Sequence, residues 1–301
     1  MNRRNFIIKS GALTGAVVLA TAHSASAKAD AAPAAKADKP KFKLGTITYN
    51  IAASWDLATL LKVCKVTGYE YVELRTSHAH KVEPSISADE RREVKKQFED
   101  AGIKLWSFGT VCEFQSPDPA AVKKQLEACR AFCQLAADVG AKGVKVRPNG
   151  LPKGVETQKT LEQIGNSLRE CGQAAEEHGV EIWVEVHGGG TQIPSNMRTI
   201  LDHCGHPKVG VCWNSNPTDV AGGSIKEAFD LLKKDIRSCH INELWSGYPY
   251  HELFSELKTI GYDRVTFMEV AGVPERLEAK EPEAAIRFMR YYKALWSELA
   301  G

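Results

Sequence analysis

A short unit recurs along most of the chain: an amphipathic helical stretch, then a glycine, then a short apolar strand. The glycines of four copies, Gly68, Gly102, Gly140 and Gly179, lie 34, 38 and 39 residues apart, and Gly261 follows after about two further units. A glycine just past a helix readily takes the left-handed conformation that ends the helix. Helix, glycine and strand at this period are typical of βαβ units, so the repeat predicts a parallel sheet covered by helices.

Eight strands complete this pattern. We expect them at Leu44–Ile51, Tyr69–Arg75, Ile103–Phe108, Val144–Arg147, the start of Val180–Gly190, Val209–Asn214, Ile236–Asn242 and Val265–Val270. Helices are expected between them, for example at Ala88–Ala101, Ala121–Val139, Thr160–His178 and Glu283–Leu299. This is the size and pattern of an α/β fold of the (β/α)8 TIM barrel type, which we predict over residues 41–301. A doubly wound open sheet is the competing fold, but no GxGxxG follows the first strand and no P-loop occurs.

The first 40 residues lack the repeat and are expected to lie outside the barrel. A twin-arginine pattern at residues 3–7 (RRNFI) precedes a mildly apolar run and the small-x-small sequence Ala25-Ser26-Ala27, which together resemble a Tat export signal over residues 1–27. The apolar run is a poor membrane span, which needs about 20 residues, so we expect no stable span after cleavage; an uncleaved anchor is the alternative. Residues 28–40 are expected to form a disordered linker. The sequence thus predicts export to the periplasm by the Tat machinery.

Charge and cysteine spacing exclude some classes of protein. Without the three basic residues of the expected signal, the formal charge of +2 becomes −1. A near-neutral protein offers no electrostatic reason to bind nucleic acid. The eight cysteines show no CxxC and no zinc-finger spacing, so we expect them to act as small buried hydrophobic side chains, with a disulfide between distant cysteines as the alternative.

The stretch Val180–Gly190 (VEIWVEVHGGG) carries an acid and an imidazole on one face of an expected strand. Trp183, Glu185 and His187 share one parity, and alternate residues of a strand face the same side. A buried carboxylate without a partner is costly, so Glu185 needs a metal, a cation or a substrate beside it. A salt-bridged core acid beside a glycine turn is the simpler interpretation.

Other expected strands also end in polar residues, and in TIM barrels the carboxyl ends of the strands form the active site. The residues that we expect there are Glu73, Arg75, His78, His80, Lys145, Arg147, Glu185, His187, Asn214, Asn216, His240, Glu243 and Glu269. Carboxylate and amide oxygens with one imidazole suit Mn²⁺, Mg²⁺ or Co²⁺, with Zn²⁺ as an alternative. Such an ion polarises a carbonyl, while carboxylates in a partly dry cavity can move protons.

Four short motifs resemble those of the xylose-isomerase-like TIM barrels, the sugar phosphate isomerase/epimerase superfamily. They are VEVHGGG with Glu185 and His187, VCWNSN with Asn214 and Asn216, CHINE with His240, and FMEV with Glu269. The resemblance implies that Glu185, Asn214, His240 and Glu269 are metal ligands, and that Glu185 and Glu269 are the catalytic acid/base pair. It also implies a small carbohydrate substrate.

Asn214 stands where this superfamily usually has aspartate. The ligands then carry a charge of −2 instead of −3 against a divalent ion, so metal affinity should fall. Either a neighbour such as Glu73, Asp219 or Glu243 compensates, or the metal is bound weakly, or it is not bound.

The remaining polar residues at the strand ends are expected to bind substrate: Glu73, Arg75, His78, His80, Lys145, Arg147, His187, Asn216 and Glu243. Lys145 and Arg147 could bind a phosphate or carboxylate, or could equally balance Glu73 and Glu185. Trp106, Trp183, Trp213 and Trp245 could stack on sugar rings, although filling the core is their default role. A periplasmic protein meets few sugar phosphates, which favours an unphosphorylated or oxidised sugar.

Three functions follow as hypotheses. The first is a metal-dependent sugar isomerase or epimerase that abstracts a proton next to a carbonyl and stabilises the enediolate. A variant with the same first step is a lyase or hydratase acting on keto-sugars or keto-glycosides. The third, motivated by Asn214, is a metal-free periplasmic sugar-binding protein. A DNA-repair endonuclease on the same barrel would need more His and Asp ligands than this chain offers.

Overall fold

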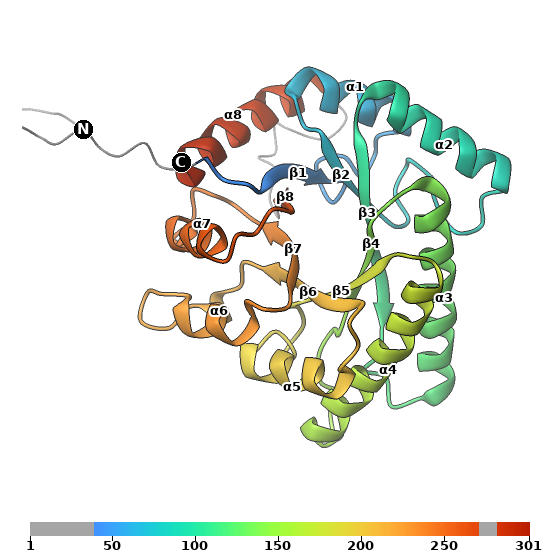
Figure 1. The fold of residues 1–301 in the computed structure, drawn as a ribbon, viewed down its shortest axis with the longest axis vertical. Coiled ribbons are helices and arrows are strands. Elements are labelled where there is room, and N and C mark those ends of the chain that lie inside the picture. The colour runs from blue at the N-terminus through green and yellow to red at the C-terminus, as the bar shows by residue number, and fades with distance from the viewer. Residues whose placement is uncertain (1–38, 271–281) are drawn as a thin grey trace, which may run out of the picture. The chain divides into compact units, whose positions relative to one another are not determined.

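Eight parallel strands close into a barrel in the computed structural model, which describes residues 39–270 and 282–301 (Figure 1). The strands are β1 (Lys43–Ile47), β2 (Tyr71–Arg75), β3 (Lys104–Glu113), β4 (Gly143–Arg147), β5 (Glu181–Glu185), β6 (Val209–Asn214), β7 (Ile236–Ile241) and β8 (Val265–Met268). Each strand pairs with the next one along the chain, and β1 pairs with β8 to complete the ring. The predicted (β/α)8 fold is confirmed.

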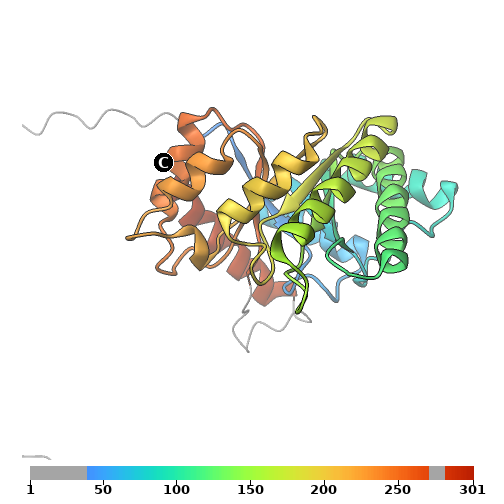
Figure 2. The same ribbon diagram turned by 90° about the horizontal axis from the view of Figure 1, so that it is seen from below.

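Helices surround the barrel on its outside, as the two ribbon views show (Figures 1 and 2). They are α1 (Leu57–Thr67), α2 (Ala88–Ala101), α3 (Pro119–Val139), α4 (Thr157–Glu177), α5 (Pro194–Cys204), α6 (Lys226–Leu232), α7 (Tyr250–Thr259) and α8 (Pro282–Ala300). A short 3-10 helix, η1 (Pro217–Asp219), lies between β6 and α6. The main apolar core fills the layer between the strands and these helices.

The glycines of the repeat end helices as expected. Gly68, Gly102 and Gly140 follow α1, α2 and α3 directly, in the left-handed conformation with φ of +73°, +69° and +82°. The amide of Gly68 donates a hydrogen bond to the Cys64 carbonyl, and the other two close their helices in the same way. Each glycine therefore turns the chain from a helix into the following strand.

Two aromatic side chains fill the lower part of the barrel interior. Trp183 and Phe267 are fully buried, and each lies two residues before an acid on the same face of its strand. A Cβ atom on Gly143 would lie 2.7 Å from the Trp183 ring, and one on Gly45 would lie 2.7 Å from the Phe267 ring. These glycines therefore make room for the aromatic rings, which form a floor below the strand ends.

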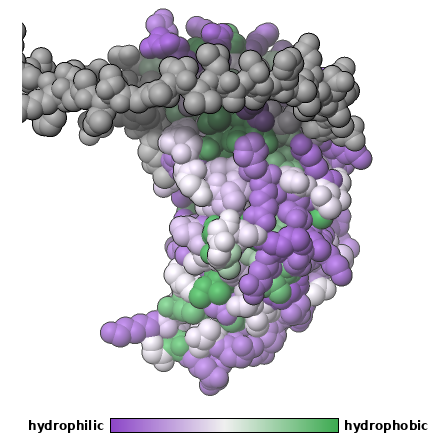
Figure 3. Space-filling model, turned by 90° about the vertical axis from the view of Figure 1, so that its left-hand side faces the viewer, coloured by the Kyte–Doolittle hydropathy of each residue, from purple (hydrophilic) through white to green (hydrophobic). Residues whose placement is uncertain are grey.

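The expected signal over residues 1–27, and all but the last two residues of the expected linker over 28–40, lie outside the described residues. No helix in the described ranges is long and apolar enough to span a membrane. The eight cysteines all lie in the described part, buried and without a disulfide, as the sequence predicted for small hydrophobic side chains. The face that carries α7 is mostly hydrophilic, with small apolar patches between the polar side chains (Figure 3).

Candidate metal and substrate site

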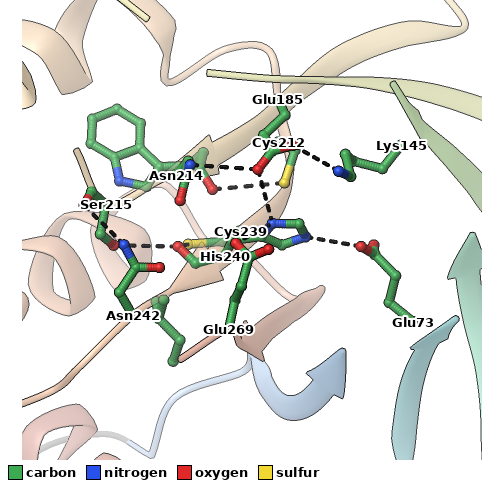
Figure 4. Close-up of polar contacts among 12 residues, drawn as sticks. Glu73, Lys145, Glu185, Cys212, Asn214, Ser215, Cys239, His240, Asn242 and Glu269 are labelled. Carbon is green, nitrogen blue, oxygen red and sulfur yellow. Dashed lines mark hydrogen bonds and ion pairs between the residues drawn. The ribbon is translucent and has the colours of Figure 1, made fainter. Parts of the chain in front are cut away.

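Acidic and basic side chains meet inside the barrel at the carboxyl ends of the strands (Figure 4). On β5, Glu185 follows Trp183 by two residues and therefore faces the barrel interior one layer nearer to the strand ends. On the neighbouring strands, Asn214 of β6 stands beside His240 of β7 in the sheet register. The alternation read from the sequence therefore places these side chains in one layer above the aromatic floor.

Glu185, His240 and Glu269 form a compact group of potential metal ligands. One ligand atom from each lies within 4.8 Å of the other two. His240 Nδ1 lies 3.5 Å from Glu185 Oε1 and 3.0 Å from Glu269 Oε2. His240 and Glu185 are buried, whereas the Glu269 side chain is 16% exposed. Three residues that are far apart in the sequence therefore point at one spot.

Glu73 lies on the other side of the His240 ring. Its Oε1 is 3.1 Å from His240 Nε2, and its Oε2 accepts a 2.7 Å hydrogen bond from the Ser107 hydroxyl. Glu73, expected to contact substrate, is fully buried and does not line the pocket above this layer. A carboxylate behind an imidazole fixes the tautomer and orientation of the ring and directs the other nitrogen toward a metal.

The Asn214 side chain completes the group of potential ligands. Its Nδ2 donates a 3.5 Å hydrogen bond to Glu185 Oε1, and its Oδ1 is buried with no hydrogen-bond partner in the described residues. A buried carbonyl oxygen without a partner costs about 1–3 kcal/mol. Two carboxylates, an imidazole nitrogen and this free amide oxygen are a donor set that fits a divalent cation.

Lys145 is the direct partner of Glu185. Its Nζ lies 2.7 Å from Glu185 Oε2, and both side chains are 3% exposed. Burial alone would raise the pKa of Glu185, but Lys145 and His240 hold that pKa well below its usual range. Burial would likewise lower the pKa of Lys145, and the Glu185 carboxylate raises it instead. Of the two roles left open for Lys145, balancing Glu185 is the one that the structure shows.

A pocket of about 200 Å³ opens above this layer. Its lining residues are Tyr49, Arg75, Lys145, Arg147, Glu185, His187, Asn214, Asn242 and Glu269. Tyr49 and Asn242 were not among the residues expected at this site. Both lie just past the carboxyl end of a strand, and Asn242 is two residues after His240, so the rule that found the other residues could have found them too.

Besides Glu73, four expected substrate contacts do not line this pocket: His78, His80, Asn216 and Glu243. His80 Nε2 is 2.9 Å from the Arg75 carbonyl, and its Nδ1 accepts a hydrogen bond from the Val82 amide, so the main chain uses both ring nitrogens. Asn216 donates a 2.6 Å hydrogen bond to the Val186 carbonyl. His80 and Asn216 therefore hold the loops that follow β2 and β6.

His78 is half-buried beside the same loop. Its Nδ1 lies 3.0 Å from the Thr48 hydroxyl, and burial together with the nearby Arg75 lowers its pKa to about 4. The imidazole is therefore neutral near pH 7.

None of the four tryptophans considered for sugar stacking lines the pocket. Trp183 and Trp213 are buried in the core, and Trp106 lies near the opposite end of the barrel with Lys142. Trp245 is 47% exposed and packs edge-on against Phe288. Filling and covering the core is the role that the structure shows for them.

The family model for the xylose isomerase-like TIM barrel matches residues 61–292. The chain therefore belongs to the xylose isomerase-like TIM barrel family. Its members include enzymes that isomerise or epimerise sugars, and the fold and the compact ligand group described above agree with that class.

Individual relatives are distant. The chain is 21% identical over 230 residues to inosose isomerase from Bacillus velezensis. The aligned residues cover 70% of this chain and 81% of that relative. The structure of the IOLI protein with a bound zinc atom has a TM-score of 0.72 and 19% identity, covering 86% of this chain and 98% of that one. D-psicose 3-epimerase with D-fructose also has a TM-score of 0.72, at 15% identity, covering 86% and 100%. At these identities the structures show the shared fold.

Proposed function

We propose that this protein is a metal-dependent sugar isomerase or epimerase that moves a proton at the carbon next to a carbonyl. The observation that carries the proposal is the convergence of Glu185, His240 and Glu269, whose ligand atoms lie within 4.8 Å of one another below an open pocket. The inosose isomerase and D-psicose 3-epimerase likenesses support the same class of reaction.

Glu185, Asn214, His240 and Glu269 would hold the divalent ion, which we propose to be Mn²⁺, Mg²⁺, Co²⁺ or Zn²⁺. When bound, the ion would polarise the carbonyl and the adjacent hydroxyl of the substrate. Glu73 would keep the His240 ring turned so that its Nδ1 faces the other ligands.

Proton transfer is assigned to the two glutamates. Glu269 is the more exposed carboxylate and would take the proton from the substrate carbon, as a general base within reach of the pocket. Glu185 would be the second acid/base group, and the Lys145 ammonium, 2.7 Å from its Oε2, would pass it the proton that it returns to the carbon. With one carboxylate removing a proton and the other returning it, the configuration at carbon can invert.

Deuterium exchange tests this proposal. The purified protein loaded with Mn²⁺ is incubated with free ketoses in deuterated water, and NMR measures deuterium at carbon. We expect deuterium in the intact sugar, and we expect Glu269→Gln to lower the exchange rate at least about a thousandfold because the general base is gone. Glu177→Gln, on the exposed surface of α4, is the matched control and should exchange normally.

Absence of exchange with every ketose, by protein that binds the ion stoichiometrically, would contradict this proposal. A lyase or hydratase acting on keto-glycosides shares the first step, and release of the aglycone from a 3-keto-glycoside would identify it. A metal-free sugar-binding protein would instead bind sugars equally well with and without a chelator and exchange nothing. We further propose that the protein works in the periplasm, which cell fractionation with and without Arg3→Lys/Arg4→Lys would test.

A further inference from the structure

Arg75 is a cation of the pocket that has no carboxylate within ion-pair distance among residues 39–270 and 282–301. Its Nη1 donates a 3.1 Å hydrogen bond to the Thr76 carbonyl, and its main-chain amide donates a 2.9 Å hydrogen bond to the Thr48 hydroxyl. The guanidinium is thus held at the pocket wall with most of its donors unused. The other two cations differ, because Lys145 is paired with Glu185 and Arg147 with Glu113.

Arg147 also keeps an unused donor. Its Nη2 contacts Glu113, but its Nε is buried with no hydrogen-bond partner in the described residues. His187 lines the same pocket, and its Nδ1 is also buried without a partner there. Burial and the positive charge of Arg147 lower the pKa of Arg75, and both residues line the same pocket. Two guanidiniums in one pocket favour an anion beside them.

The charge of the whole site leads to the same conclusion, and this step rests on the proposed function. Three cations and a divalent ion would face the four carboxylates of Glu73, Glu113, Glu185 and Glu269. With His240 neutral as a ligand, one net positive charge is left. A substrate that carries one negative charge would neutralise it.

We propose that Arg75 and Arg147 bind an anionic group of the substrate, so that the protein acts on acidic sugars in preference to neutral ones. A guanidinium presents parallel N–H donors that match a carboxylate or a phosphate. Arg75 is the last residue of β2 and Arg147 the last of β4, whereas the potential metal ligands come from β5, β6, β7 and the residue after β8. The charged group would therefore lie on one side of the pocket and the reacting carbon on the other.

Matched ligands test the proposal. Isothermal titration calorimetry measures binding of D-fructuronate, D-fructose 6-phosphate and neutral D-fructose to the Mn²⁺-loaded protein. We expect at least one of the two acidic sugars to bind about tenfold or more tightly than D-fructose at low ionic strength, and this advantage to shrink with added salt. The acid that binds more tightly shows whether the recognised group is a carboxylate or a phosphate.

Two substitutions locate the effect. Arg75→Gln should lower the affinity for the acidic sugar about tenfold more than the affinity for D-fructose, and Arg75→Lys should keep part of the preference because the charge remains. Arg130→Gln on the exposed surface of α3 is the matched control and should keep the full preference. Thermal unfolding of each variant shows that it is folded.

Equal affinity for acidic and neutral sugars, or an Arg75→Gln variant that keeps the preference, would overturn the inference. Neither result touches the proposed function, which would still show deuterium exchange with a neutral ketose. Conversely, suppose that the protein binds an acidic sugar tightly, loses that binding in Arg75→Gln, and yet exchanges no deuterium with any sugar. That result would support the anion site and contradict the isomerase.

Discussion

Asn214 is the residue at which the candidate metal site departs from the pattern expected of it. Its amide offers an oxygen but no charge, and its buried Oδ1 has no partner in the described part of the chain. Nearby, the Lys145 ammonium further reduces the negative charge by pairing with Glu185. Glu73, one of the candidates to compensate, lies behind His240 and contributes charge but no ligand atom to the group. The site should therefore bind a divalent ion weakly.

Replacing Asn214 by aspartate should tighten the metal site. Asn214→Asp adds one negative charge at ligand distance and little change in volume, so we expect at least a tenfold lower dissociation constant for Mn²⁺, equivalent to about 1.4 kcal/mol. Competition with a fluorescent chelator measures it. Asn242→Asp adds the same charge to the same pocket at a residue that bonds the Ser215 carbonyl. If Asn214→Asp and Asn242→Asp tighten Mn²⁺ binding by the same factor, Asn214 is not a ligand.

The segments that follow β6 and β7 are tied together beside the site. The Trp213 indole donates to the Tyr248 hydroxyl at 3.1 Å, and that hydroxyl donates to Asp219 Oδ2 at 3.0 Å. The Asn216 amide donates to the same oxygen at 2.8 Å. Burial raises the pKa of Asp219 to about 7, although both hydrogen bonds act in the opposite direction. Asp219 therefore titrates near neutral pH while it holds η1 in place.

Stability should fall as pH rises through this titration. Because the pKa of Asp219 is higher in the folded protein than its ordinary value of 3.8, the folded state binds the proton more tightly. The stabilisation is present below pH 3.8 and is lost progressively up to about pH 7. Between pH 5 and pH 8 the melting temperature of the wild-type protein should drop. The melting temperature of Asp219→Asn should drop less, because its side-chain amide is neutral throughout. Thermal melts at several pH values measure this, and parallel curves for the two proteins would contradict it.

The elements could be read from the sequence because they depend on local patterns. Glycines that follow helices at a period near 38 residues located β2, β3, β4, β5 and β8. The other three strands were placed by completing the pattern, and β6 was predicted with its observed bounds. The end of β3 was placed at Phe108, although the strand runs to Glu113. The pairing of Arg147 with Glu113 and the position of Glu73 behind His240 were not predictable, since they depend on how neighbouring strands are registered in the closed barrel.

At the scale of the whole molecule, the potential ligands come together only when the barrel closes. Glu185, Asn214, His240 and Glu269 come from β5, β6, β7 and the residue after β8. The unfolded chain cannot hold them together, so an ion that binds the folded protein must stabilise it. A concentration of one hundred times the dissociation constant contributes about 2.7 kcal/mol.

Removing the ion should therefore lower the melting temperature. For a domain of this size we expect a drop of about 5–10 °C after treatment with a chelator, reversed by Mn²⁺ or Co²⁺ but not by K⁺. Differential scanning fluorimetry measures it. The His240→Ala variant is the control, since it lacks one ligand and should melt at the same temperature with and without the ion. A wild-type melting temperature that changes with neither chelator nor added metal would contradict the proposed site.

The aromatic floor of the barrel determines the order in which an ion and a sugar would bind at the site. Trp183 and Phe267 close the interior directly below Glu185 and His240, so in the described part of the chain the pocket is reached from the strand ends. An ion held by Glu185, His240 and Glu269 would lie beneath a sugar in the pocket. The ion would then arrive first and leave last, and an occupied pocket should lengthen its residence time.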